Sequence, residues 1–439
     1  MVKSPCRSRA KGLLSGSPEE SFPMTKVFLT GATGFVGGEL LRRLVRDGRA
    51  VVCLVRGGSP LEARQRGRDT ERALRLPDSA RVEWLAGDME REGLGLAPST
   101  VERLCAEVSE VVHCAASTRF DLPLEEAIAT NVEGARRVGE LAQAIHAQGG
   151  LRRLLHVSTA YASGRVRGSV SAEHLPADGP DRFRNNYERT KAMAERVLRA
   201  QAARTGLPLT IVRPSIVVGD SRTGWTSNWN VLYFPMRLVA WRKTPFLSCG
   251  RTALLDCVPV DYVAEATLKL LGRADTTGGT FHLTAGPDAT DVREVFRLTC
   301  DELRRREGPR APIRTRLLGP ILWALVGTFL RLCGPARLRQ GLAGLAAYVE
   351  YTCVATRFDQ RREAALLAEE GVRCPPRAEF LPRVVAYALA ENFGRPRRSE
   401  TAASPRRLAT ALQSATGSLA EALQSGMGSV GAAPGTVSA

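Results

Sequence analysis

The hydrophobic pattern of the chain alternates short β-branched runs with longer stretches of helical periodicity from residue 26 onward. The runs that predict strands are 26–30, 50–55, 82–86, 110–114, 153–158 and 209–213. Stretches near 36–47, 124–148 and 186–205 predict helices between them. Strands that alternate with helices predict right-handed βαβ units and a mostly parallel sheet. Nearly continuous apolar strands are typical of a sheet that is covered on both faces. We therefore expect an α/β protein with a doubly wound, Rossmann-type parallel sheet.

The same pattern divides the chain into four regions. Residues 1–24 are basic and lack a long apolar run, so we expect a disordered leader rather than a secretory signal. Residues 25–300 carry the alternating elements and are expected to form one Rossmann catalytic domain, with substrate-binding insertions from about residue 220. Residues 301–394 predict a smaller, mostly helical C-terminal region, and 395–439, rich in Ala, Ser, Gly and Thr, predict a disordered tail.

One apolar segment, 317–334, bears on membrane contact. It is apolar between Arg316 and Arg331, and a helix made of only that stretch is shorter than the hydrocarbon core of about 30 Å. Two interpretations stay open: a helix in the membrane interface, which would give peripheral membrane contact, or a buried core helix.

The amino-acid composition narrows the classes of partner that the protein could bind. Among the 439 residues, 44% are hydrophobic and 24% charged, which is ordinary for a globular protein. The net charge of +17 favours anionic partners such as phosphate-bearing cofactors, acyl carriers or acidic lipids. Only 6% of residues are aromatic and none interleave with a basic stretch, which argues against nucleic acid. Ten cysteines without a C-x-x-C pair and five histidines without metal spacing predict a reduced, cytoplasmic protein with no metal site. No pattern fixes an oligomeric state.

A glycine-rich motif, "TGATGFVGGEL" (30–40), follows a predicted strand and opens a predicted helix. Gly31 permits a tight turn, Gly34 lets a diphosphate approach the backbone, and Gly37 lets the helix lie close to the sheet. The helix N-terminus then offers free N–H groups to the phosphates. Arg56 ends the second strand with no acidic residue within five positions, which favours NADPH over NADH. Beyond the third strand, Asp88 is placed to contact the adenine.

A tyrosine and a lysine in "NNYERTKAMAE" (185–195) suggest the chemistry. Tyr187 and Lys191 are four residues apart and share one helix face. Ser158 and Thr159 end the fifth strand, at the sheet edge where open α/β sheets bind ligands. Tyr187 would supply a proton to a carbonyl oxygen that has accepted charge from a hydride, and Lys191 would lower the pKa of its phenol while binding the nicotinamide ribose. Thr159 would hold the same oxygen.

These motifs together resemble the extended short-chain dehydrogenase/reductase superfamily over about 25–300. The resemblance rests on the glycine spacing, Asp88, "TNVEG" (130–134), the Tyr-x-x-x-Lys pair and "RPSIVVGDS" (213–221). The longer stretch "RPSIVVGDSRTGWTSNWN", followed by "LLDCVPVDYVAEA" (254–266), is similar to the male-sterility type branch of fatty acyl-CoA reductases and thioester reductase domains.

The resemblance assigns the site residue by residue. It implies Thr159, with Ser158 as an adjacent contender, and Tyr187 and Lys191 as catalytic residues. It implies a structural rather than proton-relaying Asn131. The residues expected at the cofactor are Gly31, Thr33, Gly34, Phe35, Val36, Gly37, Arg56, Asp88, Met89, Ala115, Ala116, Asn131, Tyr187, Lys191, Pro214 and Ser215.

The function implied is NADPH-dependent reduction of fatty acyl thioesters, carried on CoA or an acyl carrier protein, to an aldehyde or alcohol. No carrier or adenylation domain precedes residue 25 in this sequence, so we do not expect a release domain acting in cis. The alternatives are a nucleotide-sugar epimerase/dehydratase, a hydroxysteroid-type dehydrogenase, or a non-catalytic NADPH-binding scaffold. The aromatic-rich segment 224–241 is expected either as an apolar substrate wall or as core.

Overall fold

A computed structural model gives the architecture and describes residues 26–229, 231–242, 246–250, 253–311, 313, 315–319, 328, 350–353 and 355–395. The predicted leader at 1–24 lies outside the described residues, and so does the predicted tail beyond residue 395. Most of the apolar segment 317–334 also lies outside them. Its first two residues belong to a strand, β12 (Arg316–Leu318), and not to the predicted helix. Within the described chain no helix is both long and apolar enough to cross a bilayer.

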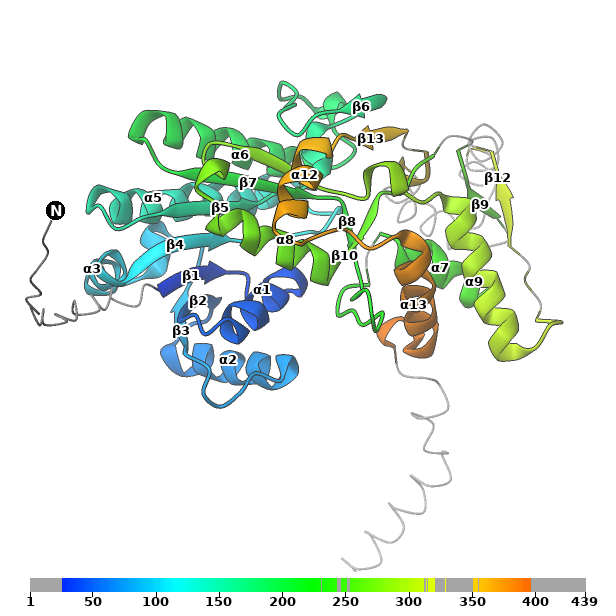
Figure 1. Ribbon diagram of the computed structural model, residues 1–439, viewed down its shortest axis with the longest axis horizontal. Helices are drawn as coiled ribbons and strands as arrows, with labels where there is room; N and C mark the ends of the chain where they lie inside the picture. Colours follow the sequence, from blue (N-terminus) through cyan, green and yellow to red (C-terminus); the bar gives the residue numbers. More distant parts are fainter. Residues whose placement is uncertain are drawn as a thin grey trace, which may run out of the picture.

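The body of the protein is a sheet of seven strands, all of whose pairings are parallel, in the order β11-β7-β5-β4-β1-β2-β3 (Figure 1). The six predicted strands are all present, and β11 adds an edge that the sequence pattern did not predict. The strands are β1 (Lys26–Thr30), β2 (Val51–Arg56), β3 (Val82–Gly87), β4 (Val108–His113), β5 (Arg153–Val157), β7 (Leu209–Pro214) and β11 (Thr280–Leu283).

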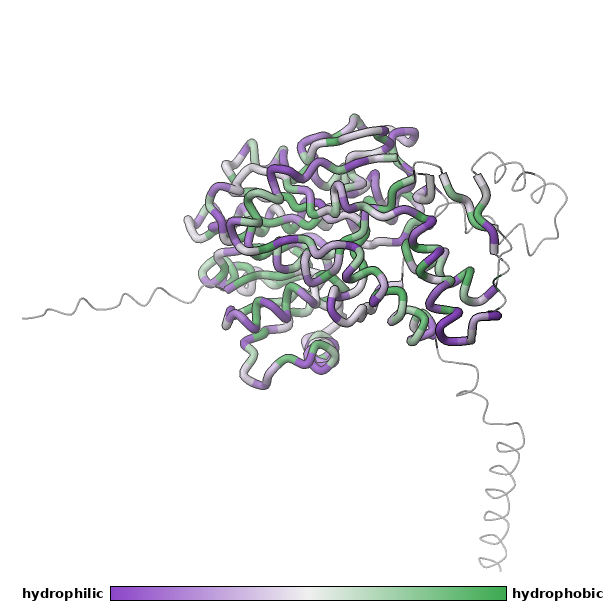
Figure 2. The backbone as a smooth tube through the Cα atoms, turned by 45° about the vertical axis from the view of Figure 1, so that its right-hand side comes forward, coloured by the Kyte–Doolittle hydropathy of each residue, from purple (hydrophilic) through white to green (hydrophobic). Residues whose placement is uncertain are grey.

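Helices cover both faces of this sheet, as the continuous apolar strands predicted. One face carries α1 (Phe35–Arg46), α2 (Pro60–Leu74), α8 (Val260–Gly272) and α12 (Arg361–Glu369). The other carries α3 (Pro98–Glu107), α5 (Gly134–Ala147) and α6 (Asn186–Thr205). Figure 2 shows the result, with hydrophobic backbone concentrated in the middle of the body and polar backbone at its periphery. The doubly wound Rossmann-type fold is therefore confirmed.

A smaller lobe lies at one end of the sheet, on the right of Figure 1. Its helices are α7 (Tyr233–Ala240), α9 (Val292–Glu307) and α13 (Arg377–Ala390). The short 3₁₀ segment η7 (Glu350–Cys353) also belongs to it. Three strand pairs complete it or tie it to the body: β8 (Ile216–Val218) with β10 (Cys257–Pro259), β9 (Phe246–Ser248) with β12, and β6 (Gly168–Val170) with β13 (Thr356–Phe358).

The described part of the C-terminal region, which the sequence predicted to be mostly helical, packs on both the body and the lobe. β13 pairs with β6 and α12 packs against α8 and β11, whereas α13 packs against α9. The chain therefore returns to the Rossmann body after residue 350. This return brings a C-terminal segment next to the end of the sheet where the chemistry-bearing residues gather.

Candidate active site

A large cavity opens at the carboxyl ends of the central strands. Its volume is about 1430 Å³, and it lies where the order of strands reverses, with β1 between β2 and β4. Open α/β sheets bind ligands at this switch point. Of the predicted site residues, those that line the cavity are Gly31, Thr33, Gly34, Phe35, Val36, Gly37, Arg56, Asp88, Met89, Ala115, Ala116, Thr159, Tyr187, Lys191, Pro214 and Ser215. Residues from six strand ends thus meet at one site.

The glycines of the first loop leave room that no other residue would leave. Gly31 has a φ of +80°, and a Cβ there would lie 2.7 Å from the backbone nitrogen of Ala115. A Cβ at Gly37 would lie 2.1 Å from the carbonyl oxygen of Gly31, so α1 can approach the loop only without one. Gly34 is the N-cap of α1 and has no capping side chain, which leaves the first N–H groups of the helix facing the cavity. This cradle fits a dinucleotide diphosphate.

Arg56 lies at the rim of the cavity, where two carboxylates meet it. Its Nη2 donates to Glu90 Oε1 at 3.1 Å, and its Nε lies 3.9 Å from Asp88 Oδ1. The side chain is 62% exposed, so these pairs are solvent-screened and weak. The sequence showed no acid near Arg56 because both carboxylates come from the loop after β3, which the parallel register brings alongside β2. A ligand phosphate would have to displace these pairs.

Asn131 differs from its predicted place among the cofactor contacts. It sits in a π-helical turn, η2 (Ala129–Glu133), between α4 (Leu124–Ile128) and α5, and it does not line the cavity. Its Oδ1 accepts from Ser117 N at 2.7 Å, and its Nδ2 donates to Ser117 O at 3.1 Å and Thr190 Oγ1 at 3.0 Å. Because its amide is committed to these bonds, Asn131 fixes the loop after β4 against α6.

The two hydroxyl residues after β5 separate into different environments. Ser158 donates to Glu195 Oε1 at 2.6 Å, and the same carboxylate accepts from Arg213 Nε at 2.8 Å and Arg213 Nη2 at 2.7 Å. Thr159 instead caps the 3₁₀ turn η3 (Ala160–Ser163), where its Oγ1 accepts from Tyr161 N at 3.3 Å, and it lines the cavity beside Tyr187. Thr159 is therefore the hydroxyl available beside the tyrosine, and Ser158 belongs to a buried charge network.

Tyr187 stands in the first turn of α6, whose N-cap Asn185 accepts from Glu188 N at 3.0 Å. One turn later, Lys191 is almost fully buried. Its Nζ donates to Val157 O at 2.7 Å and lies 3.2 Å from His156 Nε2. The i, i+4 spacing thus places both headgroups at the cavity, as the helix face predicted.

The electrostatics of the pair differ from the prediction. Burial raises the pKa of the Tyr187 phenol above its usual value, and the neighbouring Thr159 hydroxyl offsets only part of that effect. Burial also lowers the pKa of Lys191 to about 8. The expected lowering of the Tyr187 pKa by Lys191 is not seen, because the ammonium is bonded to β5 and burial prevails. A neutral phenol at neutral pH carries the proton that reduction of a carbonyl requires.

An aromatic wall beside Tyr187 was missed by the sequence analysis. Phe120 lies with its ring centroid 5.9 Å from that of Tyr187 and stacks on Tyr351 at 5.5 Å, and Tyr161 meets Tyr351 edge-on at 5.2 Å. The Tyr351 hydroxyl donates to Glu188 Oε1 at 2.7 Å. Phe120, Tyr161 and Tyr351 all line the cavity. No local periodicity marks them, because they come from three segments that only the fold brings together.

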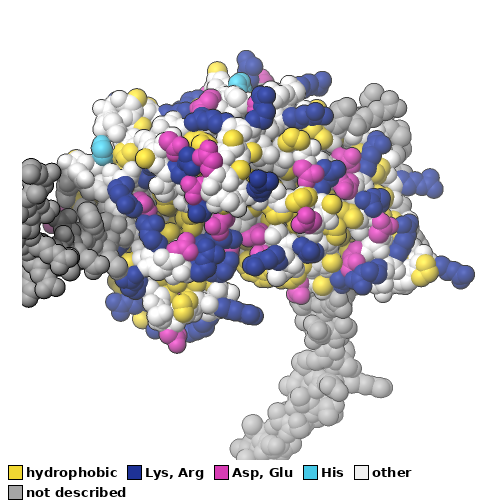
Figure 3. Space-filling model, in the orientation of Figure 1, with side chains coloured by type: hydrophobic (Ala, Val, Ile, Leu, Met, Phe, Trp, Pro, Cys, Tyr) yellow, Lys and Arg dark blue, Asp and Glu magenta, His cyan; other side chains and the backbone are white. Residues whose placement is uncertain are grey.

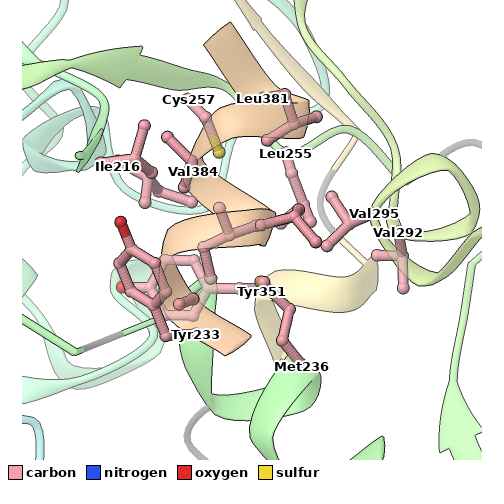
Figure 4. Packing of buried hydrophobic residues seen from close by; sticks show 14 of the residues in the cluster. Ile216, Tyr233, Met236, Leu255, Cys257, Val292, Val295, Tyr351, Leu381 and Val384 are labelled. Carbon is pink, nitrogen blue, oxygen red and sulfur yellow. The ribbon is translucent and has the colours of Figure 1, made fainter. Parts of the chain in front are cut away.

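The aromatic segment 224–241 belongs mainly to the core of the smaller lobe, which is one of the two interpretations that the sequence left open. Trp229 packs on Tyr233, Tyr387 and Phe393, and Trp241 packs edge-on to Phe393. Figure 4 shows Tyr233 among the side chains that surround α13. Trp225, which contacts Phe35, is partly exposed. None of the segment's aromatic residues is among the described residues that line the cavity.

Known proteins share this fold and these motifs. The male sterility protein family, a family of NAD-binding domains, matches residues 29–267. Glycine betaine reductase ATRR of Emericella nidulans is 31% identical over 300 residues, which cover 65% of this chain and 22% of that protein. Fatty acyl-CoA reductase wat of Drosophila melanogaster is 31% identical over 293 residues, covering 57% of this chain and 55% of that protein.

A solved structure extends the likeness to most of the chain. The terminal R domain from the myxalamid PKS-NRPS biosynthetic pathway superposes with a TM-score of 0.70 at 26% identity, covering 85% of this chain and 92% of that domain. These two curated relatives are longer proteins, of which the match spans about a fifth and little more than half respectively. The matched residues contain the glycine cradle, Thr159, Tyr187 and Lys191. The chain therefore belongs to the male sterility protein family, within the extended short-chain dehydrogenase/reductase superfamily.

Proposed function

We propose that the protein is an NADPH-dependent reductase of acyl thioesters. Membership of this family makes it an oxidoreductase with a nicotinamide cofactor, and the thioester is the substrate that we infer. The observation that carries the proposal is that Thr159, Tyr187 and Lys191 meet at one cavity with the glycine cradle. A non-catalytic scaffold would have no need of this arrangement.

The cofactor would be held by this chain's own groups. The N-terminus of α1 and the glycine loop suit the diphosphate, and the small residues Ala115 and Ala116 leave space beside them. Arg56, largely exposed at the rim, supports NADPH over NADH because a guanidinium favours a 2′-phosphate. Its pairs with Asp88 and Glu90 would then be exchanged for the phosphate. When bound, the nicotinamide supplies the hydride.

The residues around the reacting carbonyl have separate tasks. Thr159 and Tyr187 both line the cavity, so both can donate to one oxygen placed between them. Tyr187 enters as a neutral phenol and gives its proton to that oxygen when negative charge develops there. The hemithioacetal formed on the substrate then collapses with loss of the thiol and leaves an aldehyde. Lys191 orients the cofactor through the ribose hydroxyls.

The size and lining of the cavity support an acyl thioester as the substrate. A volume of about 1430 Å³ exceeds the roughly 300–1,000 Å³ of a typical single-ligand pocket, so it has room for a cofactor and a second molecule. Beside Tyr187 the wall is aromatic, formed by Phe120, Tyr161 and Tyr351, and this suits an apolar acyl chain. Fatty acyl-CoA reductases and carrier-linked reductase domains are both relatives, so we propose a fatty acyl thioester on CoA or an acyl carrier protein.

Substrate-dependent oxidation of NADPH tests the proposal. The purified protein is mixed with NADPH and palmitoyl-CoA, palmitoyl acyl carrier protein or UDP-glucose, and NADPH absorbance and free thiol are followed together. We expect NADPH oxidation matched by thiol release with at least one of the two thioesters. UDP-glucose, which has no aldehyde, ketone or thioester to accept a hydride, serves as the blank. Absence of NADPH oxidation above this blank with either thioester, in protein that binds NADPH, would overturn the proposal.

A further inference from the structure

A row of buried polar side chains crosses the sheet beneath the cavity. Thr30, His113 and His156 are register partners on β1, β4 and β5. Thr30 Oγ1 lies 2.8 Å from His113 Nδ1, the two imidazole centroids are 5.0 Å apart, and His156 Nε2 lies 3.2 Å from Lys191 Nζ. All four residues are at most 2% exposed. The row therefore ends on the lysine of the Tyr-x-x-x-Lys pair.

The hydrogen bonds of Lys191 leave one donor for a ligand. An ammonium has three hydrogens. Val157 O accepts one at 2.7 Å and His156 Nε2 is placed to accept the second at 3.2 Å. Among the described residues no other acceptor lies within hydrogen-bond reach of Nζ, and Lys191 lines the cavity. Since two bonds and the Cε–Nζ bond fix the tetrahedral headgroup, the direction of the third hydrogen is fixed as well.

The state of His156 fits an acceptor role. Burial lowers the pKa of His156 well below its usual value, and the Lys191 charge lowers it further, so the ring is neutral. A neutral imidazole that accepts at Nε2 carries its hydrogen on Nδ1. That Nδ1 is buried and has no partner among the described residues. An apolar side chain would avoid this unsatisfied group, so burial alone does not explain the histidine.

We propose that His156 is a positioning residue that accepts a hydrogen bond from Lys191 and thereby directs the remaining ammonium hydrogen at the cofactor ribose. The inference rests on the proposed cofactor-binding role of Lys191. His113 shows what an ordinary buried histidine in this row looks like, since its Nδ1 is hydrogen-bonded to Thr30 and not to a catalytic residue.

The proposal predicts a change in the pH dependence of cofactor binding. The cationic form of Lys191 binds the ribose, so its contribution is complete at low pH and is lost as pH rises through a pKa of about 8. Removing the His156 acceptor destabilises the Lys191 cation, so the contribution of Lys191 to cofactor binding must then be lost at a lower pH. The other titratable groups around Lys191 remain in place; these are His113 on β4, Cys114 after β4, and Tyr187 and Glu195 on α6.

The test is an NADPH fluorescence titration of the full chain between about pH 6 and pH 10. His156→Phe has a similar side-chain volume and no acceptor. It should bind NADPH at least about tenfold less tightly at neutral pH, and its NADPH affinity should begin to fall at a lower pH than that of the parent. His156→Gln keeps an acceptor and should restore the parent's curve. If His156→Phe does not fold, His156→Leu takes its place with the same expectation.

A matched control separates loss of any buried histidine from loss of this one. His282 is also fully buried, and its Nδ1 is bonded to Asp359 O, away from Lys191. His282→Phe should keep the parent's pH curve. A folded His156→Phe or His156→Leu protein with the parent's affinity and pH curve would overturn the proposal. If the NADPH affinity of the parent protein does not fall at alkaline pH, the role assigned to Lys191 is wrong.

Discussion

Substitution of Gly37 by alanine is the sharpest structural test of the cofactor cradle. The added Cβ would lie 2.1 Å from Gly31 O and 2.6 Å from Gly31 C, both backbone atoms that no rotamer change can move. Since ordinary contact begins at 3.4 Å, the loop and α1 must separate by about 1.3 Å. Such overpacking costs about 1–3 kcal/mol, against a gain of about 1 kcal/mol in helix propensity.

The adjacent Gly38 is the matched control. A Cβ there meets Leu74 Cδ2 at 3.3 Å, which a small shift of that flexible side chain relieves, and Ala32 O at 3.4 Å, which is ordinary contact. Gly38→Ala should therefore melt no lower than the parent and bind NADPH with at most a small change. Gly37→Ala should weaken NADPH about tenfold or more in a titration, because the diphosphate cradle is displaced. Equal NADPH affinities for the two variants would refute the reasoning.

Four further substitutions test the rim, the hydroxyl pair and the aromatic wall. Arg56→Asp should weaken NADPH much more than NADH, and equal affinities of the parent for the two cofactors would contradict the assignment. Thr159→Ala should reduce the rate of hydride transfer with little change in melting temperature. Ser158→Ala should leave the rate of hydride transfer nearly unchanged. It should lower the free energy of unfolding by about 1.5–3 kcal/mol, the range for a hydrogen bond to a charged group. Phe120→Ala should raise KM for a long-chain acyl-CoA about threefold to tenfold at unchanged NADPH affinity, and an unchanged KM would remove Phe120 from the substrate wall.

Features set by local sequence were predictable, because each depends on spacing within one segment. The strands and helices of the body follow from hydrophobic period, and the glycine loop and the Tyr187–Lys191 pair follow from fixed offsets along the chain. Their meeting at one cavity also follows, since the carboxyl ends of parallel strands share an edge of the sheet.

Features that depend on contacts between distant segments were not predictable. Tyr351 reaches the cavity only because the chain returns through β13, and the carboxylates at Arg56 arrive through the register of β3. The aromatic residues of 224–241 face the small lobe because α13 packs there. The net charge was also a weak guide to partners: Figure 3 shows Lys and Arg side chains interspersed with Asp and Glu over the visible face rather than gathered in one patch.

Single-turnover oxidation of NADPH by the parent and by Tyr187→Phe tests the central claim most directly. Enzyme saturated with NADPH is mixed with palmitoyl-CoA, and the fall in NADPH absorbance is recorded beside a separate NADPH titration. Loss of the phenol proton should slow the step by roughly 10² or more, the scale of positioned acid–base catalysis, while NADPH affinity stays the same. A Tyr187→Phe protein that oxidises NADPH as fast as an active parent would contradict the mechanism.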